Sequence, residues 1–334
     1  MRRVKVSRWA STTSRAWTSL LSSQARTAAR LVKAARPATA RRARPAAGPG
    51  DWILGQALGS ALPRRYRLYR PPGVGHAERL PLLVMLHGCT QDAESFAAST
   101  RMNALALRHR FLVLYPEQDA LANPQRCWNW YDSHSGRAAA EAASIVQAID
   151  QVLRLYPVDP QRVAIAGLSA GASMAAMLAI RHPLRFTAVA MHSGVAPGAS
   201  VSSATILPAM KGRRASAPLA LQEALPPLLV VHGSDDRTVS HRNAQASAEL
   251  WAASRQARIA DVRSVQRGQR YPMQVTDWMA GKRLAVTLCE VRGLGHAWSG
   301  GRAGHSHADS RGPDASRMLY AFVRRGWKIA RPAA

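Results

Sequence analysis

The chain has 334 residues, of which 46 are Lys or Arg and 19 are Asp or Glu, so its formal net charge is +27. Its length suits one large domain or two small ones, and a 47% share of hydrophobic residues excludes a chain that is disordered throughout. Three cysteines are too few for a disulfide scaffold. No run reaches the roughly 18 apolar residues of a membrane-spanning helix. The charge alone would suggest a nucleic-acid or anionic-surface partner.

The first 50 residues form a basic tail, with 12 Lys or Arg and no Asp or Glu, which leaves a net charge of +15 on the rest of the chain. Apolar residues at spacings near three and four predict a basic amphipathic helix over residues 14–36, which Pro37 ends before a Pro- and Gly-rich linker. Thr18 and Ser19 interrupt its apolar run, so we expect no signal peptide. A transit peptide, a surface-binding helix and a disordered tail are alternative interpretations.

Apolar runs alternate with helical patterns from Trp52 onward. Strands are expected at residues 80–86, 111–115, 162–167, 186–192, 228–232 and 284–291, and helices at 138–155, 170–181, 241–257 and 313–326. Strands that are apolar throughout and are separated by helices predict an α/β domain over residues 51–330, with a mostly parallel central sheet and helices on both faces. The stretches 198–227 and 262–282 look like insertions on this frame.

The strongest chemical signal is a Gly-x-Ser-x-Gly motif that runs from Gly167 to Gly171. A strand-like run precedes it and a small-residue helical pattern follows, as in a nucleophile elbow, where a tight strand-to-helix turn exposes the serine hydroxyl. The start of the helix directs a positive dipole end at a developing oxyanion. We therefore predict that Ser169 is the nucleophile of an α/β-hydrolase; the alternative is a structural serine in a glycine-rich turn.

The acid and the histidine follow the serine in chain order in this architecture. Asp235 and Asp236 come soon after the strand at residues 228–232, and the pattern H-G-x-x-D-x-x-V favours Asp236, with Asp235 as a turn residue. His296 follows the last strand and is the predicted base. It would take the serine proton, and the acid would fix its tautomer and stabilise the imidazolium.

A tetrahedral intermediate needs two preorganised N–H donors, an oxyanion hole. The backbone N–H of Ala170, directly after the nucleophile, is one predicted donor. The second is expected in the loop after the strand at residues 80–86, where Cys89 is the chosen residue.

Two further histidines, His305 and His307, form a His-Ser-His sequence that could suggest a metal site. No cysteine and no third spaced ligand accompany them, so we interpret them as surface histidines. We expect neither a metal nor an organic cofactor.

At these residues the chain resembles the polyhydroxybutyrate depolymerase-type esterases, which are related to feruloyl and acetylxylan esterases. The resemblance extends over about residues 52–326, and its combination of motifs is more specific than Gly-x-Ser-x-Gly alone. The matching segments are LHGCTQ (86–91), CWNWYD (127–132), GLSAGASM (167–174), HGSDDRTV (232–239), GLGHAWSGG (293–301) and RGPDAS (311–316).

The resemblance implies an α/β-hydrolase fold without a metal and hydrolysis of short-chain hydroxyacid polyesters or related esters. It carries over Ser169, Asp236 and His296 as the catalytic triad, and Cys89 as an oxyanion donor. The expected function is a serine esterase that acts on poly- or oligo-(3-hydroxybutyrate) through an acyl-enzyme. A feruloyl- or acetylxylan-type carbohydrate esterase is the alternative. A basic protein that binds nucleic acid or an anionic surface on a degenerate hydrolase fold is a third, against which the complete triad speaks.

The resemblance also makes Trp128, Trp130 and Trp298 candidates for lining an apolar ester cleft, with core packing as the alternative. Cys89 and Cys127 lie in two of the matching segments and could be close in space. We do not expect a disulfide between them to persist in a reducing cytosol.

Secreted depolymerases of this kind carry a signal peptide, a linker and a polymer-binding module, none of which the sequence predicts. We therefore expect a cytoplasmic enzyme associated with storage granules, with secretion as the alternative. Residues 1–50 are then a hypothetical docking segment for a polyhydroxyalkanoate granule surface.

Overall fold

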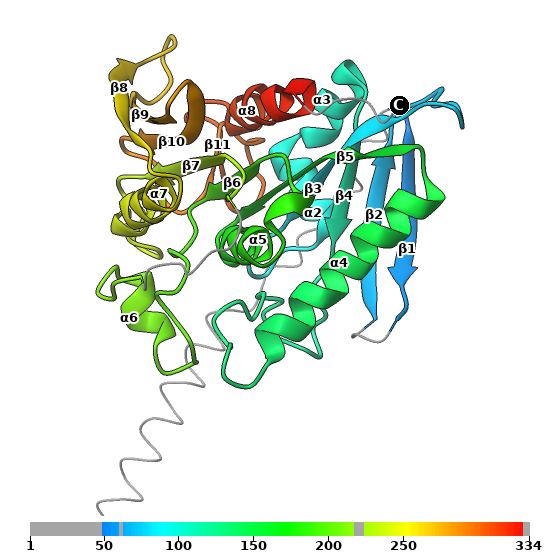
Figure 1. Cartoon of the computed structure of the whole chain (residues 1–334), viewed down its shortest axis with the longest axis horizontal. Helices are drawn as coiled ribbons and strands as arrows, with labels where there is room; N and C mark the ends of the chain where they lie inside the picture. The colour runs from blue at the N-terminus through cyan, green and yellow to red at the C-terminus, as the bar shows by residue number, and fades with distance from the viewer. Residues whose placement is uncertain (1–48, 60–62, 217–223, 330–334) are drawn as a thin grey trace, which may run out of the picture. The chain divides into compact units, whose positions relative to one another are not determined.

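The computed structural model describes residues 49–59, 63–216 and 224–329, and it is built on one ten-stranded sheet with the order β1-β2-β4-β3-β5-β6-β7-β10-β9-β8 (Figure 1). The neighbours from β4 to β10 pair in parallel, whereas β1, β2, β9 and β8 are antiparallel. The strands are β1 (Asp51–Ala57), β2 (Arg64–Arg70), β3 (Leu80–Leu86), β4 (Leu112–Pro116), β5 (Val158–Leu168), β6 (Val189–His192), β7 (Leu228–Gly233), β8 (Arg258–Val265), β9 (Met273–Ala280) and β10 (Arg283–Val291). A short parallel pair, β11 (Trp298–Ser299) and β12 (Ala308–Asp309), lies apart from this sheet.

Helices cover both faces of the sheet. They are α2 (Ala93–Thr100), α3 (Met102–His109), α4 (Arg137–Leu155), α5 (Ala170–Arg181), α6 (Ile206–Met210), α7 (Arg242–Ser254) and α8 (Ala315–Ile329), with a 3₁₀ turn at Pro183–Arg185. This architecture confirms the predicted α/β class with a mostly parallel central sheet.

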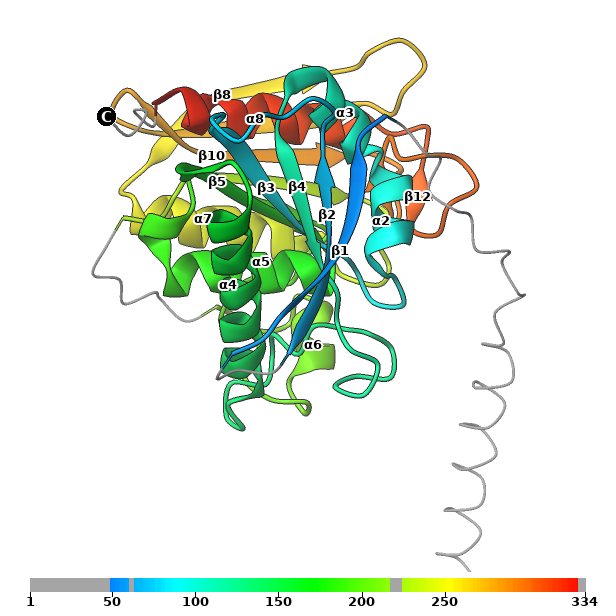
Figure 2. The same ribbon diagram turned by 90° about the vertical axis from the view of Figure 1, so that its right-hand side faces the viewer.

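The sheet is the middle of three layers, with helices on each face and one hydrophobic cluster between the sheet and the helices on each side. Side chains on a strand point alternately to opposite faces, so each strand contributes to both clusters. In β3, Val84 packs into the cluster that contains α4, α5 and α7, whereas its neighbour Met85 packs into the cluster that contains α2, α3 and α8. Figure 2 shows α8 and α3 together on one side and α4 on the other. A continuously apolar strand such as LPLLVML is therefore required wherever both faces are covered.

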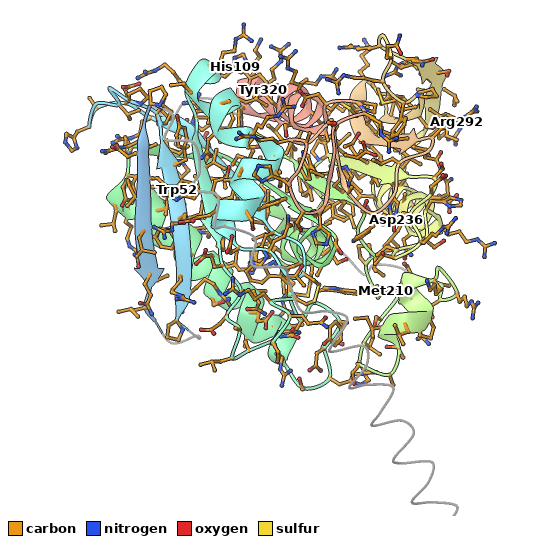
Figure 3. All side chains as sticks on the ribbon, turned by 180° about the vertical axis from the view of Figure 1, so that it is seen from behind. Trp52, His109, Met210, Asp236, Arg292 and Tyr320 are labelled. Atoms are coloured by element: carbon orange, nitrogen blue, oxygen red, sulfur yellow. A yellow bond between two sulfur atoms is a disulfide. The ribbon has the colours of Figure 1, made fainter. Side chains whose placement is uncertain are left out.

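Helices α3 and α8 also contact each other directly. The ring of His109 stacks on the ring of Tyr320 with their centroids 4.1 Å apart (Figure 3). Capping fixes the start of α2, where the Asp92 carboxylate accepts the Ser95 N–H and the Ser95 hydroxyl accepts the Asp92 N–H.

One sequence interpretation was wrong. The stretch 262–282 is not an insertion on the frame, since most of it forms the end of β8 and all of β9, which extend the sheet beyond β10. Pairing with β10 orders β9, whereas β8 is the outermost strand and most of its side chains are exposed, so no apolar run reveals it.

The predicted amphipathic helix of the basic tail lies outside the described residues. Among the helices that are described, none combines the length and the apolar character needed to cross a membrane.

Candidate active site

Ser169 stands in the sharp turn between β5 and α5. Its backbone angles are φ 54° and ψ −121°, a combination that a residue with a side chain rarely adopts. Two glycines make the turn fit, since a Cβ on Gly167 would lie 2.3 Å from the backbone of Gly171, and a Cβ on Gly171 would lie 2.2 Å from the carbonyl oxygen of Leu86. The second contact presses the first turn of α5 against the end of β3, which brings the serine beside the loop that follows β3.

The three predicted triad residues meet at the carboxyl ends of the parallel strands. The Ser169 Oγ lies 3.0 Å from His296 Nε2, and His296 Nδ1 lies 2.7 Å from Asp236 Oδ2. Because a carboxylate can only accept, the ring carries its proton on Nδ1 and presents an unprotonated Nε2 to the serine hydroxyl. The side chain of His296 is 13% exposed, so the ring is reachable from solvent while the Asp236 carboxylate beneath it is not.

Asp236 rather than Asp235 contacts the histidine. Its Oδ1 accepts the N–H groups of Thr238 and Val239, at 3.0 and 2.8 Å, which fixes the carboxylate plane. Asp235 is exposed and its carboxylate accepts the hydroxyl of Ser234. Of the two candidate acids, Asp236 is therefore the one whose carboxylate contacts His296.

A second histidine, His232, lies against the same carboxylate. Its Nε2 is 2.9 Å from the carbonyl oxygen of Val239 and 3.3 Å from Asp236 Oδ2, so the ring must carry a proton on Nε2 to satisfy two acceptors. Burial alone would raise the pKa of Asp236, but the hydrogen bonds from His232 and His296 outweigh burial and hold this pKa well below its usual range. The carboxylate is therefore ionised at neutral pH and can accept the ring protons of both histidines.

A third buried histidine, His192, supports the loop that carries His296. Its Nε2 accepts the backbone N–H of Ser299 at 3.0 Å, and its ring stacks on Trp298 with centroids 5.0 Å apart. Burial lowers the pKa of His192 to about 3, so it remains neutral and keeps its acceptor nitrogen free for this bond. Sequence reasoning missed His192 and His232, although each stands at or next to the end of a predicted parallel strand, and that position was a signal that could have identified them.

The N–H groups of the two predicted oxyanion donors, Cys89 and Ala170, have no hydrogen-bond acceptor among the described residues. The N–H of Thr90 donates to Gln125 O and that of Gln91 to Gly88 O, while no acceptor is found for the Cys89 N–H in the described part of the chain. At the start of α5, the described hydrogen bonds likewise leave the N–H of Ala170 without a protein acceptor. These two N–H groups can therefore donate to a ligand oxygen.

A disulfide links the loop after β3, which contains Cys89, to the loop that contains Cys127, contrary to our expectation. Cys89 and Cys127 are bonded, with their Cα atoms 4.3 Å apart. The expectation rested on a cytosolic redox potential rather than on geometry, and the fold brings the two loops into contact. Cys289 is a free, buried cysteine, and burial raises its pKa to about 12.

The loop that contains Cys127 is held by the buried carboxylate of Glu141, a residue of α4. Its Oε2 accepts the Asn129 N–H at 2.8 Å, and its Oε1 accepts the side-chain amide of Gln118 at 2.7 Å. The N–H of Gln118 donates to His87 Nε2, and Trp128 Nε1 donates to the His87 carbonyl oxygen. The residues next to Cys127 are therefore hydrogen-bonded to His87, two residues before Cys89.

The three candidate tryptophans are largely enclosed. Trp128, Trp130 and Trp298 are 0%, 8% and 2% exposed, and the indole N–H of Trp298 donates to Ser316 Oγ. An enclosed ring offers no surface to an ester, so burial favours the packing interpretation for Trp128 and Trp298. A substrate contact stays a prediction for Trp130 alone.

His307 of the His-Ser-His sequence is partly buried and lies beside the triad, rather than exposed at the surface as we expected. The rings of His307 and His296 have centroids 6.4 Å apart, and burial, reinforced by the charge of His296, lowers the pKa of His307. Within residues 49–59, 63–216 and 224–329, no group of three or more His, Cys, Asp or Glu side chains is arranged to hold a metal ion.

Comparison with solved structures supports the fold. An acetyl xylan esterase from Aspergillus awamori superposes with a TM-score of 0.62 and 19% identity, covering 73% of this chain and 94% of that chain. An S-formylglutathione hydrolase from Agrobacterium tumefaciens gives a TM-score of 0.53 and 15% identity, covering 84% and 94%. At these identities the likeness establishes the α/β-hydrolase fold alone.

Sequence relatives are more informative about the family. A poly(3-hydroxyalkanoate) depolymerase C from Paucimonas lemoignei is 30% identical over 247 residues, covering 70% of this chain and 59% of the relative. A probable acetylxylan esterase A from Aspergillus clavatus is 27% identical and covers 51% and 60%. The chain thus spans about half to three fifths of the length of the curated relatives it matches. The model of the family described as esterase PHB depolymerase matches residues 64–262, more than half of the chain, and the protein belongs to that family.

Proposed function

We propose that this protein is a serine esterase that hydrolyses ester bonds of poly- or oligo-(3-hydroxybutyrate) through an acyl-enzyme. The observation that carries the proposal is the continuous hydrogen-bonded chain from Ser169 through His296 to Asp236, built on a strained elbow in a member of this family.

The chemistry follows from the geometry of the three side chains. His296 Nε2 accepts the Ser169 proton as the hydroxyl oxygen attacks the ester carbonyl, and the N–H groups of Cys89 and Ala170 stabilise the resulting oxyanion. The imidazolium then protonates the leaving alkoxide, which frees an alcohol and leaves an acyl group on Ser169. Water attacks this acyl-enzyme with the same base, and the carboxylic acid is released.

The proposed substrate is a hydroxyacid polyester, and the family match and the depolymerase relative support it. A carbohydrate esterase that releases acetyl or feruloyl groups is the second candidate. Acetylxylan and feruloyl esterase relatives and the acetyl xylan esterase structure favour it. Both candidates share the same attack on a carboxylic ester.

The compartment and the granule surface are also proposals. A cytoplasmic enzyme docked on polyhydroxyalkanoate granules through residues 1–50 remains one proposal, tested by deleting these residues and measuring co-sedimentation with granules. Unchanged co-sedimentation would reject the docking role. The Cys89–Cys127 disulfide supports the alternative of secretion, because such bonds persist in oxidising compartments.

The mechanism is tested by Ser169→Ala. We expect hydrolysis to disappear while the circular dichroism spectrum and unfolding midpoint remain those of a folded protein. Mass spectrometry after mixing with a p-nitrophenyl ester should show one acyl group on Ser169 in the native chain and none in the variant. Activity that survives the substitution would defeat the assignment.

The substrate is tested by parallel assays on native amorphous granules, crystalline polymer, soluble short-chain esters and acetyl or feruloyl carbohydrate esters. A kcat/KM highest for hydroxybutyrate oligomers and polymer supports the depolymerase proposal. A higher value for the sugar esters would replace it with the second candidate.

A further inference from the structure

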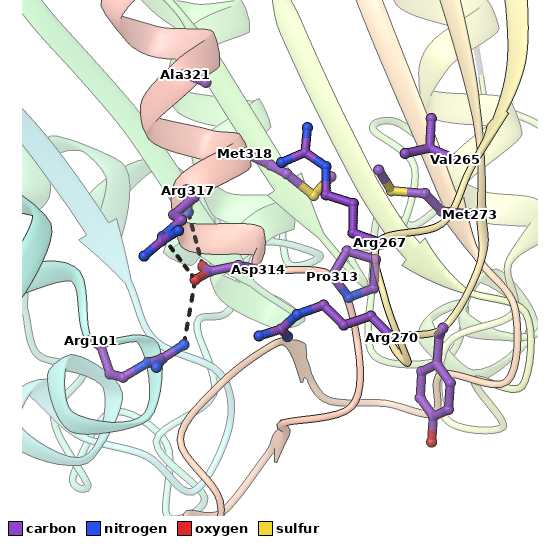
Figure 4. Close-up of a pocket in the computed structure, with 11 residues that line it drawn as sticks. Arg101, Val265, Arg267, Arg270, Met273, Pro313, Asp314, Arg317, Met318 and Ala321 are labelled. Atoms are coloured by element: carbon purple, nitrogen blue, oxygen red, sulfur yellow. Dashed lines mark hydrogen bonds and ion pairs between the residues drawn. The ribbon is translucent and has the colours of Figure 1, made fainter.

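A cavity of about 440 Å³ lies between the β8–β9 hairpin and α8, and none of the triad residues lines it (Figure 4). We call it the arginine pocket. Its lining comes from three segments that are distant in sequence: the start of α3, residues 265–273 and residues 313–321. The lining residues are Arg101, Val265, Arg267, Arg270, Tyr271, Met273, Pro313, Asp314, Arg317, Met318 and Ala321.

Positive charge dominates the rim of this pocket. Four arginines face a single carboxylate, Asp314, which lies 3.5 Å from the guanidinium groups of both Arg101 and Arg317. Figure 4 shows these three side chains joined on one side of the space, with Arg267 and Arg270 on the other. The lining residues therefore carry a net charge of +3.

The two remaining arginines are not neutralised by a carboxylate. Arg270 donates to the carbonyl oxygens of Ser310 and Gly312, which hold its side chain in place but carry no formal charge. Among the described residues, the guanidinium of Arg267 has neither a hydrogen bond nor an ion pair, and the residue is exposed. A planar guanidinium presents paired N–H donors that match a carboxylate or a phosphate.

The lining beneath the arginines is apolar. Val265 and Met273 come from the hairpin and Met318 from α8, and each is partly buried against the cluster that contains α2, α3 and α8. Methionine side chains adapt to irregular apolar ligands. The pocket thus combines a cationic rim with an apolar floor, and its volume lies in the range of small-molecule sites, roughly 300–1,000 Å³.

We propose that the arginine pocket binds a small amphiphilic anion, in which an acidic head group meets the arginines and a short acyl chain lies on the methionines. The first 50 residues contain no acidic side chain, so this segment supplies no carboxylate to the arginines. A carboxylate and a phosphate monoester share the required head-group chemistry. The site is separate from the triad and does not rest on the proposed esterase activity.

The proposal is tested by calorimetric titration of the full chain with octanoate, octyl phosphate, octanol and inorganic phosphate. We expect one molecule of octanoate or octyl phosphate to bind per chain. Each should bind about tenfold or more tightly than octanol or inorganic phosphate, because only these two ligands combine an acidic head group for the arginines with an alkyl chain for the apolar floor. Whichever of the two amphiphiles binds more tightly identifies the preferred head group.

The informative variant is Arg267→Glu, since this side chain makes no contact that the fold needs. We expect it to weaken amphiphile binding about tenfold or more. Arg258→Glu is the matched control: it lies at the other end of β8, is exposed and makes the same change in net charge. It should leave the Kd unchanged.

Three results would overturn the proposal. Octanol binding as tightly as octyl phosphate would indicate an apolar site without a role for the arginines. Equal weakening by Arg267→Glu and Arg258→Glu would indicate attraction by the overall charge. Unchanged binding in Arg267→Glu would place the ligand elsewhere.

Discussion

The ring of His232 lies 3.3 Å from the carboxylate of Asp236, which also accepts the ring proton of His296 at 2.7 Å. One buried acid therefore sits between two imidazole rings, of which only that of His296 reaches the nucleophile. His232 is fully buried and in contact with the acid, so it acts as a positioning residue that orients the carboxylate.

Substitution of His232 should affect kcat more than KM. Leucine removes the Nε2–H donor, and the loss of a hydrogen bond to a charged group predicts a fall in kcat of about tenfold with KM nearly constant. Glutamine places an amide N–H near the same point and should restore most of the rate. Steady-state kinetics on a soluble ester measures both variants, and equal losses in both would reduce His232 to a packing role.

Asp236→Asn should lower kcat by about 10³–10⁴-fold, because an amide no longer selects the tautomer of His296 that leaves Nε2 free. The neighbouring substitution Asp235→Asn is its control, since this exposed carboxylate accepts the hydroxyl of Ser234 rather than the ring N–H of His296. It should leave kcat within about twofold of the native value. If the Asp235 variant lost activity instead, the assignment of the acid would be reversed.

Reduction of the Cys89–Cys127 disulfide should destabilise the fold and slow hydrolysis. The bridge joins cysteines 38 residues apart, and the loop-closure entropy corresponds to about 4 kcal/mol of unfolding free energy. Urea unfolding with and without a phosphine reductant measures this difference, and kcat should fall with it because the Cys89 N–H loses its fixed position. Under denaturing, non-reducing conditions one thiol, that of Cys289, should titrate. Three titrating thiols would contradict the bridge.

Fold stability should decrease as pH falls from about 6.5 to 4. Burial lowers the pKa of His87 to about 4 and that of His192 to about 3, whereas both titrate near 6.5 in the unfolded chain. The unfolded chain thus binds more protons in this window, so acid favours unfolding, by up to about 1.4 kcal/mol per pH unit for each histidine.

Unfolding free energies in urea at several pH values measure this slope. The variant His192→Gln should show a shallower slope, because one of the two titrating groups is gone, while His76→Gln, an exposed histidine, should keep it. A stability that is constant between pH 7 and 4.5 would contradict the prediction.

The parallel core of the fold was predictable because its strands are buried on both faces. The run at residues 80–86 matches β3, and the small-residue pattern at 170–181 matches α5. The antiparallel strands were not predicted. Four arginines interrupt β2 (RRYRLYR), and β8 is exposed along most of its length, so neither strand carries the apolar run that marks a buried one.

The triad was predictable because chain order and motif spacing specify it, and the structure brings its three side chains within hydrogen-bonding distance. The groups behind the triad were not predictable. The contact between His232 and Asp236 depends on how the chain turns after β7. The Cys89–Cys127 bridge depends on the approach of two loops that are distant in sequence, one of which is held by the buried Glu141.

The backbone of Ser169 has a consequence for evolution and for engineering. Its positive φ costs roughly 1–3 kcal/mol, and a glycine at the same position would adopt these angles without a Cβ penalty. At this one residue, hydrolysis requires the serine hydroxyl, whereas the stability of the fold would increase with glycine. A selection for heat-resistant variants that does not also score hydrolysis would favour the loss of the nucleophile.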